Sequence, residues 1–303
     1  MSNKNLTRHC PMCSNTVGRV FKNVDGYDVV RCTQCRFVFV DIDNDVADDV
    51  NIFDGETTLA RYYAREPIYS IAYYDATLKR LSNYLGKKQL RILDFGSGNG
   101  MFMRRARAAG HLISGVDVSP YAAQAKDEFD LDVQICDVRE CTFDRESFDV
   151  VFSHATYEHI SDPVGIGKVL AQFVRPGGLL VLSGLPNFQT VGIQVFKNFF
   201  NNGLGHVNHF ERHALKSLMT TLDLDTVKLH SYGWEVWYLH SRYLQLSKKY
   251  RKNAQVNRTY AELIRNYDTY RPSTFEKIVS YVYAFCSPPL LGLSLEVWGK
   301  KRG

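Results

Sequence analysis

The sequence lacks the features of a membrane-spanning or secreted chain. Its 303 residues contain no apolar run of about 18 residues, the length that a helix needs to cross a bilayer. The first residues show no basic segment followed by an apolar one, which a secretory signal would require. We therefore expect a cytoplasmic protein whose seven cysteines are reduced.

The chain also lacks a strong charge of either sign. Lys and Arg number 37 and Asp and Glu number 32, which gives a formal net charge of +5. Such a mild excess neither requires nor excludes a nucleic acid partner. No dense cluster of Lys and Arg lies beside the N-terminal cysteines, where RNA would be gripped, and this argues against nucleic acid. The length allows one large α/β domain with appendages.

Four of the cysteines form two CxxC pairs within the first 35 residues. Cys10 and Cys13 make the first pair and Cys32 and Cys35 the second, with 18 residues between the pairs. Two disulfides or unrelated thiols are the alternative, which a reducing compartment disfavours. Four thiolates at this spacing suit a tetrahedral structural site for Zn²⁺. The sequence therefore predicts a zinc ribbon over residues 1–45, stabilised by its metal because it is too small for its own core.

A glycine-rich loop follows a short apolar segment in the first third of the chain. Residues 93–100 read LDFGSGNG, and a helical pattern begins directly after them. Gly96, Gly98 and Gly100 permit a tight turn and a close approach of the backbone to a ligand. About 20 residues later a second predicted strand ends in Asp117, where a carboxylate can accept hydrogen bonds from both ribose hydroxyls. The spacing alone fits a glycine turn in any α/β domain, but the acidic residue favours a nucleotide-binding unit.

The pattern DxGxGxG, which begins at Asp94, resembles motif I of the class I S-adenosylmethionine-dependent methyltransferases. The resemblance continues through residues 88–240, because residues 148–154 (FDVVFSH) look like the fourth strand of that family and residues 175–178 (RPGG) like its turn into the fifth. It implies an α/β fold, a Rossmann-like seven-stranded methyltransferase sheet over residues 88–303. It also implies that S-adenosylmethionine is bound at or near the ends of four strands, by Asp94, Phe95, Gly96, Ser97, Gly98, Gly100, Asp117, Val118, Asp137, Val138 and Ser153.

Flanking segments complete the predicted organisation. Residues 46–87 are predicted as an acidic linker and a tyrosine-rich helical cap, and residues 242–292 as a basic helical insertion. Cap tyrosines such as Tyr73 and Tyr74 either pack amphipathic helices on the sheet or face the substrate, and the resemblance implies the second arrangement. The insertion is either a solvated helical pair or a surface for phosphate or anionic lipid, so it is the candidate for peripheral membrane contact.

The segment after the fourth predicted strand limits which kinds of methyl acceptor the sequence is compatible with. RNA and DNA amino-methyltransferases of this fold carry [DN]PP[YF] there, whereas this chain has SHAT, which argues against methylation of exocyclic amines. Quinone-pathway O-methyltransferases carry a metal-binding ExxEH there. Ala155 stands at the first acidic position of that motif, so we expect Glu158 and His159 to be structural. His154 lies closer to the expected position of the methyl group and is a catalytic candidate.

Histidines gather in a predicted lid over residues 186–215. Residues 206–210 (HVNHF) match the Hxx[YH]F pattern of nucleotide-sugar C-methyltransferases and of relatives linked to polysaccharide synthesis, which also carry an N-terminal four-cysteine zinc module. As metal ligands, His206 and His209 lack a matching carboxylate in the sequence around them. We therefore predict that His206 is the general base and that His209 orients it or the substrate.

These patterns together predict transfer of a methyl group from S-adenosylmethionine to a small sugar-like acceptor, either a nucleotide sugar or a surface glycan. We expect an oxygen acceptor, because the further C-terminal domain that the C-methyltransferases usually carry is not in this sequence. Two alternatives stay open. One is an rRNA guanine methyltransferase with a zinc module, although its last zinc ligand is usually histidine rather than Cys35. The other is an inactive zinc-ribbon adaptor, against which the intact Asp94, glycines and Asp117 argue.

Overall fold

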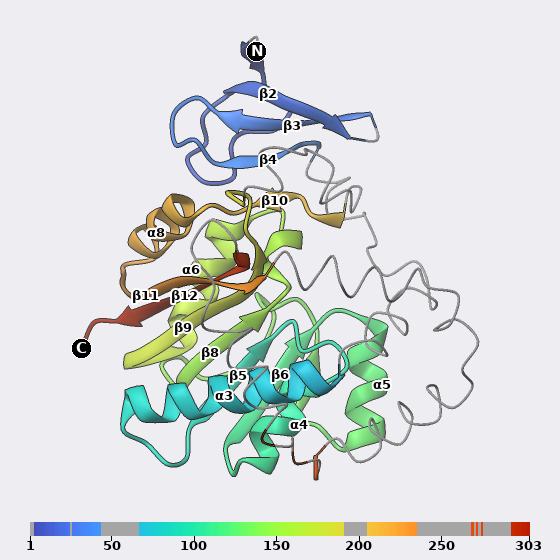
Figure 1. Cartoon of the computed structure of the whole chain (residues 1–303), viewed down its shortest axis with the longest axis vertical. Coiled ribbons are helices and arrows are strands. Elements are labelled where there is room, and N and C mark those ends of the chain that lie inside the picture. The colour runs from blue at the N-terminus through green and yellow to red at the C-terminus, as the bar shows by residue number, and fades with distance from the viewer. Residues whose placement is uncertain are drawn as a thin grey trace.

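The chain forms two β-sheets, a smaller one near the N-terminus and a larger one that is covered by helices (Figure 1). The computed structural model describes residues 3–24, 26–43, 67–190, 205–234, 268–269, 271, 274 and 292–303. The predicted acidic linker, the first residues of the cap, residues 191–204 of the lid and nearly all of the insertion lie outside the described residues. Within the described ranges, no helix has the length and apolar character needed to cross a membrane.

The larger sheet has seven strands, of which six run in the same direction and one runs in the opposite direction. In chain order its strands are β5 (Arg91–Phe95), β6 (Leu112–Asp117), β7 (Val133–Ile135), β8 (Phe148–His154), β9 (Val174–Pro186), β11 (Leu224–Trp234) and β12 (Gly292–Lys301). Their order across the sheet is β11-β12-β9-β8-β5-β6-β7, and β12 runs antiparallel to both of its neighbours. The chain thus winds outward from β5 in both directions, which confirms the predicted Rossmann-like seven-stranded methyltransferase sheet.

Helices cover both faces of this sheet, because successive residues of a strand point to opposite faces. They are α3 (Pro67–Leu85), α4 (Met101–Ala108), α5 (Pro120–Phe129), α6 (Pro163–Phe173), α8 (Arg212–Thr221) and the 3₁₀ turn η1 (Tyr157–His159). Ile92 and Val150 pack in one cluster with α3 and α4. Their chain neighbours Leu93 and Val151 pack in another cluster with α6 and α8. Both faces of the sheet are therefore buried. A ligand can reach the sheet at the C-terminal ends of its parallel strands.

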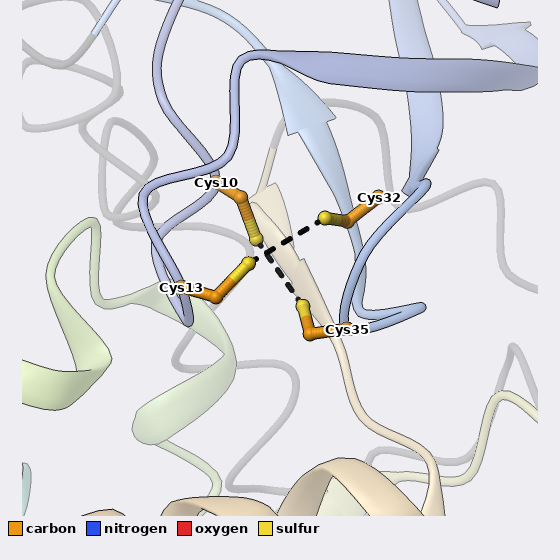
Figure 2. A group of neighbouring side chains, drawn as sticks. All are labelled: Cys10, Cys13, Cys32 and Cys35. Carbon is orange, nitrogen blue, oxygen red and sulfur yellow. Dashed lines mark hydrogen bonds between the residues drawn. The ribbon is translucent and has the colours of Figure 1, made fainter.

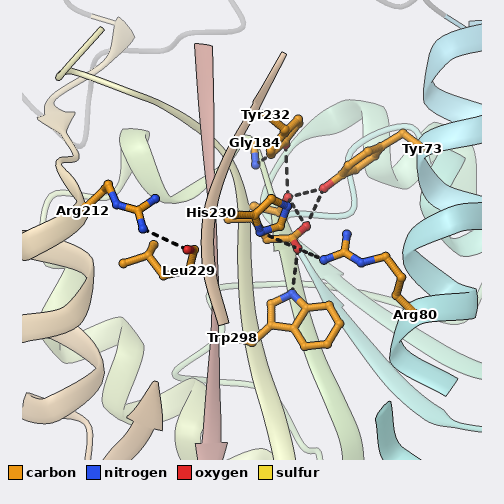
Figure 3. Close-up of polar contacts among 10 residues, drawn as sticks. Tyr73, Arg80, Gly184, Arg212, Leu229, His230, Tyr232 and Trp298 are labelled. Carbon is orange, nitrogen blue, oxygen red and sulfur yellow. Dashed lines mark hydrogen bonds and ion pairs between the residues drawn. The ribbon is translucent and has the colours of Figure 1, made fainter. Parts of the chain in front are cut away.

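A buried carboxylate on β12 binds two residues of α3 and one of its own strand, and Figure 3 labels these three partners, Tyr73, Arg80 and Trp298. Glu296 on β12 is 0% exposed and accepts hydrogen bonds from the Tyr73 hydroxyl at 2.9 Å, from Arg80 Nη2 at 2.8 Å and from Trp298 Nε1 at 2.8 Å. Burial opposes its ionisation, but Arg80, His230 and the Tyr73 hydroxyl bring the pKa of Glu296 below its usual value. The Tyr73 hydroxyl is thus used in a hydrogen bond within the core. For Tyr73 and the equally buried Tyr74, packing on the sheet replaces the substrate-facing cap that the resemblance implied.

The smaller sheet takes its last strand from a distant part of the chain. Its strands are β1 (Asn3–Asn5), β2 (Val17–Val24), β3 (Tyr27–Cys32), β4 (Val38–Asp41) and β10 (Asn208–His209), in that order across the sheet. β10 pairs antiparallel with β4, so that His209 lies opposite Val38, and the Val40 N–H donates to the Val207 carbonyl at 2.9 Å. The four-cysteine module is therefore joined directly to the histidine-bearing segment of the predicted lid (Figure 1).

Side chains reinforce this short strand pairing. Arg31 donates two hydrogen bonds to Glu211, from Nη1 to Oε2 at 2.9 Å and from Nη2 to Oε1 at 2.8 Å. The Phe37 ring lies 5.4 Å from the Phe210 ring, and both rings belong to the core cluster that continues under the larger sheet. A two-residue strand has few backbone bonds of its own, so these contacts are what fix it in place.

We expect Arg31→Gln to lower the free energy of unfolding by about 2–3 kcal/mol, because it leaves the buried Glu211 carboxylate without its two charge-assisted hydrogen bonds. Urea unfolding followed by fluorescence measures this difference. Arg19→Gln is the matched control, since Arg19 lies opposite Arg31 on β2 and makes one exposed hydrogen bond to Asn3. Equal losses in the two variants would show that the Arg31–Glu211 pair does not stabilise the junction.

Candidate active site

The glycine loop begins where β5 ends and is fixed by the carboxylate that ends β6. The Gly98 N–H donates to Asp117 Oδ2 at 2.7 Å, and the Ser119 N–H donates to Asp117 Oδ1 at 2.7 Å. Each carboxylate oxygen has further acceptor capacity after these bonds, as ribose hydroxyls require. The predicted ribose ligand therefore has a second task, which is to hold the loop against the neighbouring strand.

Two of the loop residues have no room for a side chain. Gly96 has φ +76°, and a Cβ there would lie 2.2 Å from the Thr156 hydroxyl oxygen. Gly100 has φ +72°, and a Cβ there would lie 2.2 Å from Leu131 Cδ1. These positions need glycine both for the backbone conformation and for the space. The contact with Thr156 also shows that the segment after β8 lies directly against the loop.

Asp94, at the end of β5, is a buried carboxylate without a hydrogen-bond donor among the residues that the structure describes. It is 3% exposed, and burial together with the negative charge of Asp117 raises its pKa well above the usual value. A buried carboxylate is unfavourable unless a positive group compensates it. The ammonium and sulfonium groups of S-adenosylmethionine are such groups, so the residues at this end of the sheet fit that molecule.

The remaining predicted cofactor residues fall into two environments. The Ser97 and Ser153 hydroxyls are buried and have no hydrogen-bond partner within the described ranges, so a ligand could satisfy them. Farther along the sheet edge Val118 is 69% exposed, and the carboxylate of Asp137 is bound by Arg139 at 2.6 Å, with hydrogen bonds from Arg139 lowering its pKa. The side chains of Phe95 and Val138 belong to the core, so only their backbone atoms remain for the cofactor.

His154 ends β8 beside the glycine loop. The preceding Ser153 pairs with Phe95 of β5, so His154 stands level with the first glycine of the loop. Its ring packs on Tyr73 and Tyr74 at centroid distances of 5.3 and 5.5 Å. Burial lowers the pKa of His154 to about 4, and the charge of Glu296 opposes this only in part. The imidazole is therefore neutral at pH 7 and carries a free lone pair.

A second polar group forms between η1 and the segment before β10. Glu158, His159 and His206 each offer one ligand atom, and these three atoms lie within 4.8 Å of one another. Burial raises the pKa of Glu158 to about 8 and lowers that of His206 to about 3. The statement that the lid histidines lack a matching carboxylate is thus wrong, because Glu158 supplies one. Sequence reasoning missed it because 47 intervening residues separate Glu158 from His206 and no local pattern connects them.

His209 lies outside this group, on strand β10. Its ring lies 5.0 Å from the Phe188 ring. Burial lowers the pKa of His209 to about 4. No finding tests the catalytic roles predicted for His154, His206 and His209, so they stay predictions.

The four N-terminal cysteines converge as free thiols on one point (Figure 2). Their sulfur atoms all lie within 4.8 Å of one another. Cys10 Sγ is 3.5 Å from Cys35 Sγ, and Cys13 Sγ is 3.6 Å from Cys32 Sγ. In a tetrahedral zinc–thiolate site, with metal–sulfur bonds of about 2.3 Å, the sulfur atoms lie about 3.8 Å apart. The cluster therefore has the donor type, number and spacing that such a metal requires.

We expect Asp117→Ala to weaken S-adenosylmethionine binding at least about tenfold, because it removes both a charged ribose acceptor and the anchor of the Gly98 N–H. Isothermal titration calorimetry measures this affinity directly. Asp132→Ala is the matched control, since Asp132 lies just before β7, which pairs with β6 on the side away from β5. Among the described residues its exposed carboxylate accepts a hydrogen bond only from the Ser114 hydroxyl. Unchanged affinity in Asp117→Ala would remove this residue from the cofactor site.

Comparisons with known proteins agree with this geometry. Residues 61–229 match the model of a family described as a methyltransferase domain. A ubiquinone biosynthesis O-methyltransferase of Coxiella burnetii is 27% identical over 112 residues, which are 35% of this chain and 48% of that protein. The protein of that name from Xanthomonas campestris is 24% identical over 161 residues, which are 48% of this chain and 67% of that protein. The similarity to the Coxiella protein thus spans about half of that protein's length.

A solved structure supports the same fold. A methyltransferase of Thermotoga maritima, described as S-adenosylmethionine-dependent and as a possible histamine N-methyltransferase, superposes with a TM-score of 0.52. The superposition covers 83% of this chain and 98% of that one at 15% identity, so the likeness shows the fold alone. The family model, by contrast, spans more than half of the 303 residues. The chain therefore belongs to this family of methyltransferase domains.

Proposed function

We propose that the protein transfers the methyl group of S-adenosylmethionine to a hydroxyl oxygen of a small sugar-like acceptor. The observation that carries the proposal is the neutral, half-buried His154 beside the glycine loop, at the strand end where ligands bind in this fold. Oxygen is favoured because both curated relatives are named as O-methyltransferases. A nucleotide sugar or a glycan is favoured because the HVNHF segment occurs together with a four-cysteine module.

Each of the residues at the C-terminal strand ends would contact a different part of the cofactor. S-adenosylmethionine, when bound, supplies a methyl group that is activated by its sulfonium centre. Asp117 would accept hydrogen bonds from the ribose hydroxyls, and Asp94 would compensate the positive charge of the amino acid end. Gly96 and Gly98 let the backbone approach the ligand, and Asp137 lies toward the expected adenine end.

The protein also has to remove the acceptor's proton. A hydroxyl group becomes strongly acidic as its oxygen gains a methyl group, so even a weakly basic imidazole can take the proton. His154 is neutral, and its ring is held in one orientation by Tyr73 and Tyr74. In this proposal His154 takes the role of proton acceptor that the sequence predicted for His206, because His154 stands level with the glycine loop, whereas His206 leads into β10 of the other sheet.

We infer that the four cysteines hold one Zn²⁺. Four protein ligands complete a tetrahedral shell, so this metal has no open position for a substrate and acts on the fold. Cys32 ends β3 and Cys35 lies just before β4, so the bound metal fixes the turn that leads into β4. Because β4 pairs with β10, the same metal supports the histidine-bearing segment through the backbone.

We expect purified, reduced protein to contain about one zinc ion per chain. Cys32→Ser should lower the zinc content and the melting temperature, because the incomplete shell no longer stabilises the module. Atomic absorption and thermal unfolding measure the two effects. Cys136→Ser is the control, since Cys136 lies outside the module and faces Cys141 at 3.0 Å. A wild-type protein without zinc would remove the assignment.

We expect labelled S-adenosylmethionine to transfer its methyl group to a member of an acceptor panel that contains nucleotide sugars, oligosaccharides, phenols and RNA. Mass spectrometry should locate the product methyl on an ether oxygen of a sugar. His154→Ala should lower turnover at saturating acceptor by about 10²-fold and leave cofactor affinity unchanged, as expected for a lost proton acceptor.

The control for this experiment is His213→Ala, because His213 is exposed and paired with Glu211. Normal turnover in His154→Ala would exclude it as the proton acceptor. Methylation of RNA alone, at a ring nitrogen or carbon, would replace the proposed function with that of an rRNA guanine methyltransferase.

A further inference from the structure

We propose that Glu158, His159 and His206 form a second metal site, which takes a divalent transition-metal ion and is distinct from the four cysteines. Glu158 and His159 belong to η1, which follows β8, and His206 comes from the segment that leads into β10. Their three ligand atoms lie within 4.8 Å of one another. Two imidazoles and one carboxylate are a donor set that suits such ions.

The hydrogen bonding of His159 shows which of its nitrogens is available. His159 Nδ1 contacts the carbonyl oxygen of Gly205 within hydrogen-bond distance. A carbonyl oxygen only accepts, so Nδ1 carries the proton and Nε2 carries the lone pair. Metal-binding histidines commonly donate their other N–H to a backbone carbonyl in this way, which fixes both the tautomer and the ring orientation.

The free nitrogen faces a carboxylate rather than a donor. His159 Nε2 lies 3.9 Å from Glu158 Oε1, a separation too long for a hydrogen bond. Two electron-pair donors thus lie close together with no hydrogen bond between them. Metal bonds of about 2.0–2.2 Å would place neighbouring ligand atoms about 3–3.5 Å apart, so a small closure would bring both onto one ion.

One oxygen of the buried Glu158 carboxylate has no partner among the described residues. The residue is 2% exposed, and the oxygen without a hydrogen-bond partner is Oε2. A proton would neutralise the charge and still leave one oxygen without a partner. A divalent ion would instead satisfy the carboxylate, His159 Nε2 and one nitrogen of His206 together.

The remaining coordination positions determine what this ion can do. Three protein ligands leave open positions, as in catalytic rather than structural metal sites. Thr156 touches the glycine loop at Gly96 and stands two residues before Glu158, so the site lies at the cofactor end of the sheet. An acceptor hydroxyl bound to the ion there would be a stronger acid and would be held in one orientation.

This consequence rests on the proposed O-methylation, whereas metal binding itself does not. In the transfer, the acceptor oxygen forms a bond to the methyl carbon as the bond between that carbon and sulfur breaks. The sulfur keeps the electron pair and becomes neutral, and the hydroxyl proton passes to His154. No oxidant or reductant is needed, so the ion acts only as a Lewis acid.

Titration with Mn²⁺ tests the site, because thiolates favour softer ions and the cysteine cluster therefore does not compete. The protein is used with its cysteine-bound metal, without S-adenosylmethionine or acceptor, and free Mn²⁺ is followed by electron paramagnetic resonance. We expect saturable binding of about one ion per chain. Glu158→Gln and His206→Asn should each weaken it at least about tenfold, as expected for a lost ligand.

His213→Ala is the matched control, because this histidine lies in the same part of the sequence but outside the group. Mn²⁺ should raise the melting temperature of the wild type and of His213→Ala and leave that of the two ligand variants unchanged. If Glu158→Gln does not fold, His206→Asn still gives the test. Absence of saturable binding in the wild type, or equal binding in the ligand and control variants, would overturn the proposal.

The outcome separates this site from the proposed function. Saturable binding that depends on Glu158 and His206, together with no methylation of any hydroxylated acceptor, would leave the metal site standing and remove the proposed function. Methylation of a hydroxyl by a protein that binds no Mn²⁺ would support the proposed function and remove the metal site.

Discussion

The antiparallel pairing of β4 with β10 is the interaction on which the arrangement of the whole protein depends. It covers two residues on each strand, and it is the only strand contact between the two sheets in the part of the chain that the structure describes. So short a ladder is weak by itself, and the Arg31–Glu211 pair and the Phe37–Phe210 contact supply what it lacks. The N-terminal module is thus a support for the segment that carries His206 and His209 rather than an independent appendage.

At the cofactor end the controlling contact is the one between Asp117 and the Gly98 N–H. It connects the ends of two adjacent parallel strands and so holds the loop open on the side of the ligand. Below the loop, Glu296 binds Tyr73 from α3 and Trp298 from its own strand, and Tyr73 in turn supports the His154 ring. The cofactor loop thus depends on the Asp117 carboxylate, and the ring of the predicted proton acceptor packs on a tyrosine that Glu296 holds in the core.

The parts of this arrangement that could be predicted are those whose cause is local in the sequence. The helix Pro120–Phe129 has such a local cause, because Ser119 caps it and proline fills its first position. The glycine loop and the CxxC pairs were readable for the same reason, since spacing alone specifies them. The proximity of Glu158 to His206 and the pairing of Arg31 with Glu211 could not be read, because such contacts leave no periodic pattern. The tyrosines of α3 show the same limit: their number was visible, but the carboxylate that binds Tyr73 lies 223 residues away.

The two proposed metal sites differ in whether their protein ligands fill the coordination shell, and this difference fits their positions in the fold. Four thiolates close the shell of the first ion, so it can only fix backbone, and it lies where a small sheet has little core of its own. Two imidazoles and one carboxylate leave the second ion open, and it lies where the parallel strands of the larger sheet end. The first supports the second, because β4 holds β10 and His206 stands two residues before β10. Loss of the cysteine-bound metal would therefore displace one ligand of the open site, while the Asp117 contact with the glycine loop, which belongs to the other sheet, would remain.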